Sequence, residues 1–361
     1  MKKENNMFNK NLFAKKLQNI EPYKVDTNNY KARLDANESF IPLREDIRKK
    51  LCGIIENFDF NRYPDPAATS LKEAFCDYYG LKPEKVCAGN GSDEIISLLM
   101  NCFLDFGSTV MIFTPDFSMY AFYARLAGMK VVECKKRSDY SVDFDLAKKM
   151  IKENDVKLVI FSNPCNPTGA IEKKADIEAL ANDCPETIFV VDEAYMDFAR
   201  IKDSESFLAD TEKYENVVVL KTLSKALGAA SLRLGFIIAD KSFCDMFYAV
   251  KSPYNVNGLS QACGEVLLRE KAYLDECTAK LVSSCRSLYD DIVGKGLGEP
   301  CESFTNFVFY RDEKAAEKQD FLRQNGVLIR KFGIDGGALR ITSGTDEENS
   351  LVTDGLCRFK N

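Results

Sequence analysis

Short runs of apolar residues recur through the middle of this 361-residue chain, and they constrain its fold more than any other feature. The runs are continuous instead of alternating with polar residues, and stretches with helical periodicity separate them. Continuous runs indicate strands buried on both faces, which predicts a mostly parallel sheet covered by helices. We interpret six runs as such strands: Thr109–Phe113, Lys130–Cys134, Val156–Phe161, Thr187–Val191, Asn216–Leu220 and Leu234–Ala239.

The most specific motif, Thr222-Leu223-Ser224-Lys225-Ala226-Leu227-Gly228, follows the run that ends at Leu220. Binding sites of parallel sheets lie at the carboxyl ends of strands, so a lysine in this turn can face a pocket. A lysine that is desolvated or close to another cation, here Arg233, loses its proton and can attack a carbonyl carbon. Most lysines after strands are solvated, but the nearby Ser224 hydroxyl and second cation suit a phosphate monoester. Lys225 is therefore our candidate for a lysine that forms a Schiff base.

Two further motifs lie at the ends of neighbouring predicted strands. Asp192 ends the run Ile188–Val191, and Tyr195 follows three residues later. A buried carboxylate needs a cationic partner, and a protonated pyridine nitrogen would be one. The stretch Ser162-Asn163-Pro164-Cys165-Asn166-Pro167-Thr168-Gly169 contains two Asn-Pro pairs, which predict an irregular turn that can aim the Asn166 amide at a phenolic oxygen. A purely structural loop could have the same composition.

The segment Ala88-Gly89-Asn90-Gly91-Ser92-Asp93-Glu94 opens a predicted helix. Small residues and free backbone amides at a helix N-terminus form an anion site, here at Gly91, Ser92 and Asp93. The segment half-matches the dinucleotide-binding fingerprint, but Glu94 replaces the third glycine and argues against that function. The alternative interpretation is that Ser92 or Asp93 only caps the helix.

One aromatic residue and two arginines complete the candidate site. Phe117 follows the predicted strand Thr109–Phe113, and its ring could offer a stacking face or belong to the core. Arg340 lies among apolar residues, and Arg330 ends the run Val327–Ile329. Guanidinium groups bind carboxylate or phosphate through two parallel hydrogen bonds, which suits an anionic substrate. The alternative is that both arginines are exposed and form surface ion pairs.

Over nearly its whole length, the chain resembles the fold-type I aminotransferases, which use pyridoxal 5'-phosphate (PLP). The order of Asn166, Asp192 and Lys225 carries this resemblance, and Pro253-Tyr254-Asn255-Val256-Asn257 is similar to the branch that acts on histidinol phosphate. The closest alternatives are a decarboxylase resembling threonine-phosphate decarboxylase and an aromatic or broad-range amino-acid aminotransferase. A non-catalytic PLP-binding module of a regulator is a further alternative, which would not need the catalytic lysine.

The resemblance implies a fold and a division into domains. A large domain, with a mostly parallel seven-stranded sheet covered by helices, is expected beside a smaller α+β domain. We expect an N-terminal arm and part of the small domain at residues 1–40, the large PLP-binding domain at 41–257 and the small C-terminal domain at 258–361. Three strands are expected in the small domain: Phe304–Tyr310, Val327–Arg330 and Ala338–Thr342.

The resemblance also implies roles for individual residues. Lys225 would hold PLP and move the proton at the substrate Cα. Asp192 would keep the ring nitrogen protonated, and Tyr195 would share the ring oxygen with Asn166. Other cofactor contacts are expected from Gly91, Ser92, Asp93, Phe117, Thr222, Ser224 and Arg233. Substrate contacts are expected from Tyr23, Asn37, Arg330 and Arg340.

The resemblance also implies a homodimer. Tyr63, in Arg62-Tyr63-Pro64-Asp65-Pro66, is expected to reach the cofactor phosphate of the neighbouring subunit. From the residues alone a surface turn is the better interpretation of this proline-rich segment, and the resemblance reverses that preference. The family usually continues with Asn-Pro after the equivalent of Asn37-Glu38, whereas Ser39-Phe40 follow here.

Composition narrows the chemistry. The chain has no histidine, which excludes Ser-His-Asp and Cys-His catalysis and any histidine-ligated metal site, so no metal is expected. A net charge of -6 with scattered basic residues predicts small-molecule partners instead of nucleic acid or an anionic membrane. Thirteen cysteines without C-x-x-C spacing fit reduced thiols and a cytoplasmic protein. We expect no signal peptide, and no run approaches the roughly 18 apolar residues of a membrane helix.

Overall fold

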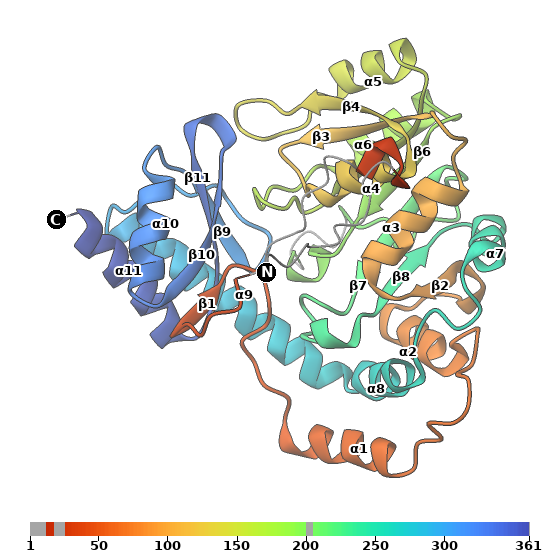
Figure 1. Ribbon diagram of the computed structural model, residues 1–361, viewed down its shortest axis with the longest axis horizontal. Coiled ribbons are helices and arrows are strands. Elements are labelled where there is room, and N and C mark those ends of the chain that lie inside the picture. The colour runs from red at the N-terminus through yellow and green to blue at the C-terminus, as the bar shows by residue number, and fades with distance from the viewer. Residues whose placement is uncertain (1–11, 18–25, 200–204, 361) are drawn as a thin grey trace, which may run out of the picture.

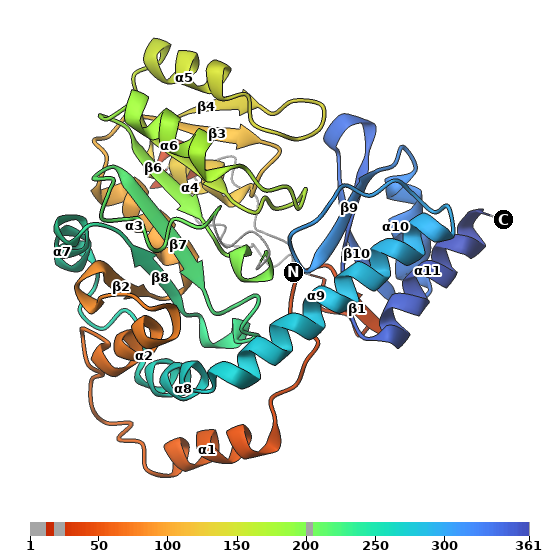
Figure 2. The same ribbon diagram turned by 180° about the vertical axis from the view of Figure 1, so that it is seen from behind.

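Two sheets of different size lie side by side in the computed structural model of the protein, which describes residues 12–17, 26–199 and 205–360 (Figure 1). A long helix, α9 (Lys271–Gly294), runs from the edge of the large-sheet layer to the small sheet, as Figure 2 shows from behind. Tyr23, which is expected to contact the substrate, lies outside the described residues.

Within the described residues the large sheet has seven strands, in the order β2-β8-β7-β6-β5-β3-β4. Neighbouring strands are parallel, except that β8 runs antiparallel to both β2 and β7. The predicted mostly parallel, seven-stranded sheet is thereby confirmed. Its strands are β2 (Val86–Gly89), β3 (Thr109–Thr114), β4 (Lys130–Lys135), β5 (Val156–Ser162), β6 (Ile188–Asp192), β7 (Val217–Thr222) and β8 (Gly235–Ile238).

Strand β5 shows why the apolar runs are continuous. Val159 and Phe161 belong to the apolar cluster on one face of the sheet, whereas Leu158 and Ile160 belong to the cluster on the other face. Because both faces are buried, successive residues of the strand are all apolar. The six predicted runs do not include β2, because its sequence Val-Cys-Ala-Gly has a single β-branched side chain and gives a weak strand pattern.

The small sheet has the strand order β1-β10-β11-β9. Its three expected strands are present as β9 (Phe307–Arg311), β10 (Val327–Phe332) and β11 (Ala338–Thr342), and β11 lies between the other two and is antiparallel to both. The fourth strand, β1 (Ala32–Leu34), is three residues long and pairs in parallel with β10. Because its partner lies near the other end of the chain, no local pattern indicates β1.

Helices cover both faces of the large sheet and one face of the small sheet (Figures 1 and 2). Besides α9, they are α1 (Glu45–Glu56), α2 (Thr69–Tyr79), α3 (Gly91–Cys102), α4 (Met119–Ala127), α5 (Phe144–Glu153), α6 (Lys174–Asp183), α7 (Lys241–Val250), α8 (Gly258–Arg269), α10 (Ala315–Gln324) and α11 (Asp346–Lys360). Short 3₁₀ segments are η2 (Lys15–Leu17), η3 (Pro83–Lys85), η4 (Met196–Phe198), η6 (Ala230–Leu232) and η7 (Ile334–Gly336). None of the helices in the described ranges is long and apolar enough to cross a membrane.

Gly235, the first residue of β8, lets the N-terminus of α3 lie against the large sheet. A Cβ at this position would lie 2.6 Å from both the carbonyl carbon of Gly91 and the backbone nitrogen of Ser92. These are backbone atoms of the first turn of α3, so they cannot swing aside as a flexible side chain would. The close approach therefore requires glycine.

Gly235→Ala should lower the free energy of unfolding by about 1–3 kcal/mol, the usual range for overpacking. Gly53→Ala in α1 is the control, since a Cβ there would meet nothing within 4 Å. Alanine should leave that helix as stable or stabilise it by up to about 1 kcal/mol. Urea unfolding of both variants measures the difference, and equal stabilities would contradict the close approach.

Candidate active site

Lys225 lies in a tight turn directly after β7, at the carboxyl edge of the large sheet. The backbone amide of Ser224 donates to the Thr222 hydroxyl at 3.1 Å, and that hydroxyl donates to Ser224 Oγ at 2.9 Å. The Lys225 side chain is half-buried, and its Nζ donates to the backbone oxygen of Ala36 at 2.9 Å. Nζ also lies 6.0 Å from the centroid of the Tyr195 ring. The amine is thus held at the edge of the sheet and faces the N-terminal segment of the chain.

Asp192 ends β6, the strand beside β7, and its side chain is buried. The Tyr120 hydroxyl donates to its carboxylate at 2.7 Å, and the backbone amide of Ala194 donates at 3.0 Å. No lysine or arginine of the described residues forms an ion pair with it. Burial raises the pKa of Asp192 to about 6, although the hydrogen bond from Tyr120 partly opposes this shift. The carboxylate is therefore buried with neutral donors and lacks a cation.

Asn166 and Arg340 meet where the two sheets face each other. Arg340, on β11 of the small sheet, donates from Nη1 to Asn166 Oδ1 at 2.5 Å and from Nη2 to the backbone oxygen of Asp35 at 2.6 Å. Its guanidinium carbon also lies 5.4 Å from the centre of the Phe307 ring. Because the side-chain Oδ1 of Asn166 accepts from the arginine, the side-chain NH₂ group of Asn166 is left to serve as a donor.

Asn37 joins the Asp192 loop to the small sheet. Its Nδ2 donates to the Tyr195 hydroxyl at 2.8 Å, and its Oδ1 accepts from the Thr342 hydroxyl at 3.0 Å. The residue is buried and adopts a left-handed backbone conformation with φ of 55°, which asparagine tolerates better than most residues. Asn37, expected to contact substrate, thus contacts Tyr195 directly.

A cradle for an anion forms at the N-terminus of α3. Gly91 has a φ of 78°, and a Cβ at this position would lie 2.6 Å from Nη2 of Arg233. Arg233, itself left-handed at φ 53°, forms an ion pair with Asp93 at 3.3 Å. Ser92 is half-buried between these residues in the sequence. Backbone amides at the start of a helix and a guanidinium group suit a phosphate.

The remaining predicted site residues, Phe117, Arg330 and Tyr63, differ in their burial and in the elements that carry them. Phe117 is half-buried, and its ring packs edge-on against Tyr120 at 5.4 Å between centroids. Arg330 on β10 lies directly opposite Arg340 across the antiparallel pair, so both side chains are on one face of the small sheet. Tyr63, in contrast, is 80% exposed and stacks on Tyr254 at 4.4 Å.

The sequence did not indicate a buried network beneath the turn that carries Asn166. The carboxylate of Asp116 accepts from the Ser162 hydroxyl at 2.5 Å, and that hydroxyl accepts from the backbone N–H of Asn166 at 3.0 Å. Lys136 lies 3.6 Å from Asp116 and donates to the Cys165 sulfur at 3.0 Å. The network joins the ends of β3, β4 and β5. The local signal was a charged residue a few positions after the end of each of two predicted strands, Asp116 after Phe113 and Lys136 after Cys134.

Three features of this site fit PLP. The buried carboxylate of Asp192 has no cationic partner among the described residues, and a protonated ring nitrogen would supply one. The cradle at Gly91 and Arg233 suits the cofactor phosphate. Lys225 offers an amine in the turn after β7, the strand next to the one that Asp192 ends, and its Nζ donates to a backbone oxygen.

Comparisons with known proteins agree with this geometry. The family model for aminotransferase class I and II matches residues 24–355. The histidinol-phosphate aminotransferase of Clostridium novyi (strain NT) is 38% identical over 343 residues, which cover 94% of this chain and 95% of that protein. The solved histidinol-phosphate aminotransferase from Sinorhizobium meliloti, in complex with pyridoxal-5'-phosphate, has a TM-score of 0.84 at 23% identity and 92% coverage of both chains. The L-threonine-O-3-phosphate decarboxylase from Porphyromonas gingivalis has a TM-score of 0.77 at 24% identity, covering 91% of this chain and 99% of that one.

The fold is therefore that of the fold-type I PLP enzymes, as the resemblance predicted. Within that class, the chain belongs to the class I and II aminotransferases, whose cofactor is PLP.

The raised pKa of Asp192 predicts how stability depends on pH in the cofactor-free protein. The folded carboxyl group has a pKa of about 6 instead of the ordinary 3.8, so its contribution to stability is lost as the pH rises from about 4 to about 7. The Asp192→Asn variant carries no charge at this position. Its free energy of unfolding, relative to that of the parent, should therefore rise over that pH interval by up to about 3 kcal/mol.

Urea unfolding at pH values of about 4.5 and about 7.5 measures this change. Asp145→Asn, at an exposed position of α5, is the control. Its free energy of unfolding relative to the parent should differ little between the two pH values. If the Asp192 variant behaves like this control, the carboxyl group of Asp192 is not desolvated in solution.

Proposed function

We propose that this protein is an aminotransferase that moves an amino group between L-histidinol phosphate and 2-oxoglutarate, a step of histidine biosynthesis. The products would be imidazole-acetol phosphate and L-glutamate. The observation that carries this proposal is the 38% identity with the Clostridium novyi histidinol-phosphate aminotransferase over 94% of the chain. The site supports it, because two arginines of the small sheet face the edge that carries Lys225 and Asp192.

Arg340 and Arg330 form the proposed substrate anion site. They lie directly opposite each other on β11 and β10, and Arg340 reaches Asn166 of the large sheet. A phosphate monoester and a carboxylate both present oxygens spaced for a guanidinium fork. One pair of arginines can therefore bind histidinol phosphate in one half-reaction and glutamate in the other, with further contacts from Asn37 and Tyr23.

When bound, PLP supplies an aldehyde that exchanges amines and a ring that accepts electrons from the substrate Cα. Lys225 would hold it and, once released, take and return the proton at that Cα. Asp192 would keep the ring nitrogen protonated, since its buried carboxylate lacks a cation. Tyr195 and the NH₂ group of Asn166 would bind the ring oxygen, and Phe117 would stack on the ring. The phosphate would be held by Gly91, Ser92, Asp93, Thr222, Ser224 and Arg233.

A decarboxylase of phosphorylated amino acids is the second candidate, because the Porphyromonas gingivalis enzyme of that kind has the same fold. The two reactions differ in which Cα bond breaks. Incubating the PLP-loaded protein separately with L-histidinol phosphate, L-threonine phosphate and L-glutamate distinguishes them. An aromatic or broad-range aminotransferase would instead prefer amino acids without a phosphate.

L-Histidinol phosphate and L-glutamate should each convert the cofactor to its amine form, seen as a change in absorbance, and no donor should release CO₂. Lys225→Ala should slow these conversions by about two to four powers of ten or more, since a positioned base contributes that much. Release of CO₂ from L-threonine phosphate, with the cofactor unchanged, would overturn the proposal in favour of the decarboxylase.

We further propose that the protein is a cytoplasmic homodimer in which Tyr63 completes the neighbouring subunit's site. The 80% exposure of Tyr63 and its stacking on Tyr254 support this role, because an aromatic pair on the surface is available to a partner. The thirteen cysteines, which form no disulfide, fit a reducing compartment.

Mixing Lys225→Ala subunits with Tyr63→Ala subunits, each of low activity alone, should restore one intact site in every heterodimer. The expected recovery is roughly half of the parent activity per heterodimer, as two-fold symmetry requires. Phe106→Ala, which changes another exposed aromatic residue, should stay active by itself and serves as the control. An absence of recovery in heterodimers whose formation is verified would show that Tyr63 does not act across subunits.

A further inference from the structure

One face of the small sheet faces the large sheet, and it carries more than the substrate arginines. Arg340 lies opposite Phe309 of β9 and opposite Arg330 of β10, while Ala338 lies opposite Arg311 and Phe332. Directly opposed residues share a face, so these six side chains form one surface, which we call the seam face. The other face of this sheet, with Val308 and Leu339 among its residues, packs against α10 and α11.

Tyr140 connects the large sheet to the seam face. It belongs to the loop between β4 and α5, yet its ring is 3% exposed and packs with Phe309, Ala338 and Phe332 of the small sheet. The ring meets that of Phe309 edge-on, at 5.4 Å between centroids. Tyr140 thus inserts into a cluster that is otherwise made by the C-terminal part of the chain.

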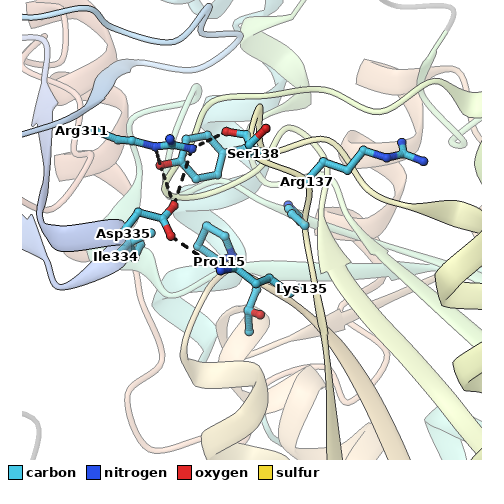
Figure 3. A pocket seen from close by; sticks show the side chains of 10 residues that line it. Pro115, Lys135, Arg137, Ser138, Arg311, Ile334 and Asp335 are labelled. Atoms are coloured by element: carbon cyan, nitrogen blue, oxygen red, sulfur yellow. Dashed lines mark hydrogen bonds and ion pairs between the residues drawn. The ribbon is translucent and has the colours of Figure 1, made fainter.

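Polar contacts hold the inserted ring, and Figure 3 labels three residues that take part in them, Arg311, Ser138 and Asp335. Arg311 Nε donates to the Tyr140 hydroxyl at 2.7 Å, and its Nη2 donates to the backbone oxygen of Ser138. The Tyr140 hydroxyl donates in turn to Asp335 at 3.5 Å, and Arg311 forms an ion pair with Asp335 at 3.6 Å. The Arg311 guanidinium also lies 4.7 Å from the centre of the tyrosine ring. A single residue of the large-sheet loop is therefore held by ring packing and by its hydroxyl.

These contacts border a cavity of about 460 Å³ between the two sheets, with Pro115, Lys135 and Ile334 among its lining residues. Its four lining cations have acidic partners: Lys135 and Arg311 pair with Asp335, Lys136 with Asp116, and Arg137 with Asp143. The cavity is therefore not a ready anion site.

The backbone of Tyr140 is strained, with a φ of 68°. A bulky residue in the left-handed region costs about 1–3 kcal/mol, and such strain persists only where the surroundings fix it. Glycine would avoid the strain, but it has neither the ring nor the hydroxyl that reach the seam face. The contacts of the Tyr140 ring and hydroxyl therefore have to offset this conformational cost.

We infer that Tyr140 is a positioning residue for Arg340: it fixes the seam face, and thereby the guanidinium that binds the substrate anion, relative to the cofactor edge of the large sheet. Phe309, which packs on Tyr140, lies directly opposite Arg340, and the Arg340 guanidinium lies 5.6 Å from the ring centre of Phe332 in the same cluster. The inference rests on the proposed function, because it assigns these contacts to substrate binding.

The test uses Tyr140→Phe, which keeps the ring and removes its hydrogen bonds to Arg311 and Asp335. Its first readout is the dissociation constant of the PLP-loaded protein for succinate, an unreactive dicarboxylate, measured by calorimetry. The second readout is hydrogen exchange of the β9 and β11 amides. Arg311→Met tests the partner, and Arg323→Met, at an exposed arginine of α10 paired with Asp320, is the control.

Tyr140→Phe and Arg311→Met should weaken succinate binding roughly three- to tenfold, the range that one hydrogen bond is worth, and the control should not. Exchange in β9 and β11 should rise, whereas the dissociation constant for PLP should not change. Adding Tyr140→Phe to Arg340→Ala should not weaken succinate binding further, because Tyr140 affects that binding through Arg340.

Faster exchange with unchanged succinate binding would make Tyr140 a purely structural contact and overturn the inference. The inference would also be overturned if the losses of succinate affinity caused by Tyr140→Phe and Arg340→Ala simply add in the double variant. It would equally be overturned if succinate binding in the parent does not depend on Arg340. Failure of the proposed function has a different signature. In that case L-histidinol phosphate would not convert the cofactor, while the coupling between Tyr140 and Arg340 would still be measured with succinate.

Discussion

The buried carboxylate of Asp192 is the constraint on which the arrangement of the site depends. A carboxylate in an apolar interior is costly unless a cation accompanies it, and among the described residues only Tyr120 and one backbone amide donate to it. A protonated pyridine nitrogen would complete this environment. The position of that nitrogen would limit where the rest of PLP can lie. Lys225, in the turn after the neighbouring strand, and the cradle at Arg233 lie at the same edge of the sheet.

In the proposed site the large sheet would provide the cofactor contacts, but it would not complete the site. The proposed substrate arginines come from the small sheet, and the two parts meet through buried polar contacts. Asn37 bonds to Tyr195, and Arg340 bonds to Asn166. Small changes in how the sheets meet would therefore move the substrate anion relative to the reacting carbon. This dependence gives the contacts made by Tyr140 a functional meaning beyond packing.

The sequence predicts those parts of the structure whose signal is local. Strands such as β5 are buried on both faces and are continuous in the sequence, whereas β1 has three residues and depends on a partner near the other end of the chain. Motifs at strand ends indicated Lys225 and Asp192 as neighbours, because adjacent parallel strands end at one edge. Contacts that cross from one element to another, such as that of Tyr120 with Asp192, leave no such pattern.

The same limit applies to the buried network of Asp116 and Lys136, since a charged residue after a strand is usually solvated. Tyr140 is a further case, because nothing in a polar loop indicates that one ring is buried in a distant sheet. The surface turn that the residues alone favour for the Tyr63 segment agrees with the 80% exposure of Tyr63, whereas its proposed role depends on a second subunit and leaves no local pattern.

The central claim is that Lys225, and not another lysine of the chain, holds PLP. Borohydride reduction of the loaded protein fixes the cofactor to its lysine, and mass spectrometry of the peptides locates it. Lys136 and Lys221 are suitable internal comparisons because both are buried. The account predicts a pyridoxyl group on the peptide that contains Lys225 and none on the peptides that contain Lys136 or Lys221. A pyridoxyl group on either of those lysines, with Lys225 unmodified, would contradict it.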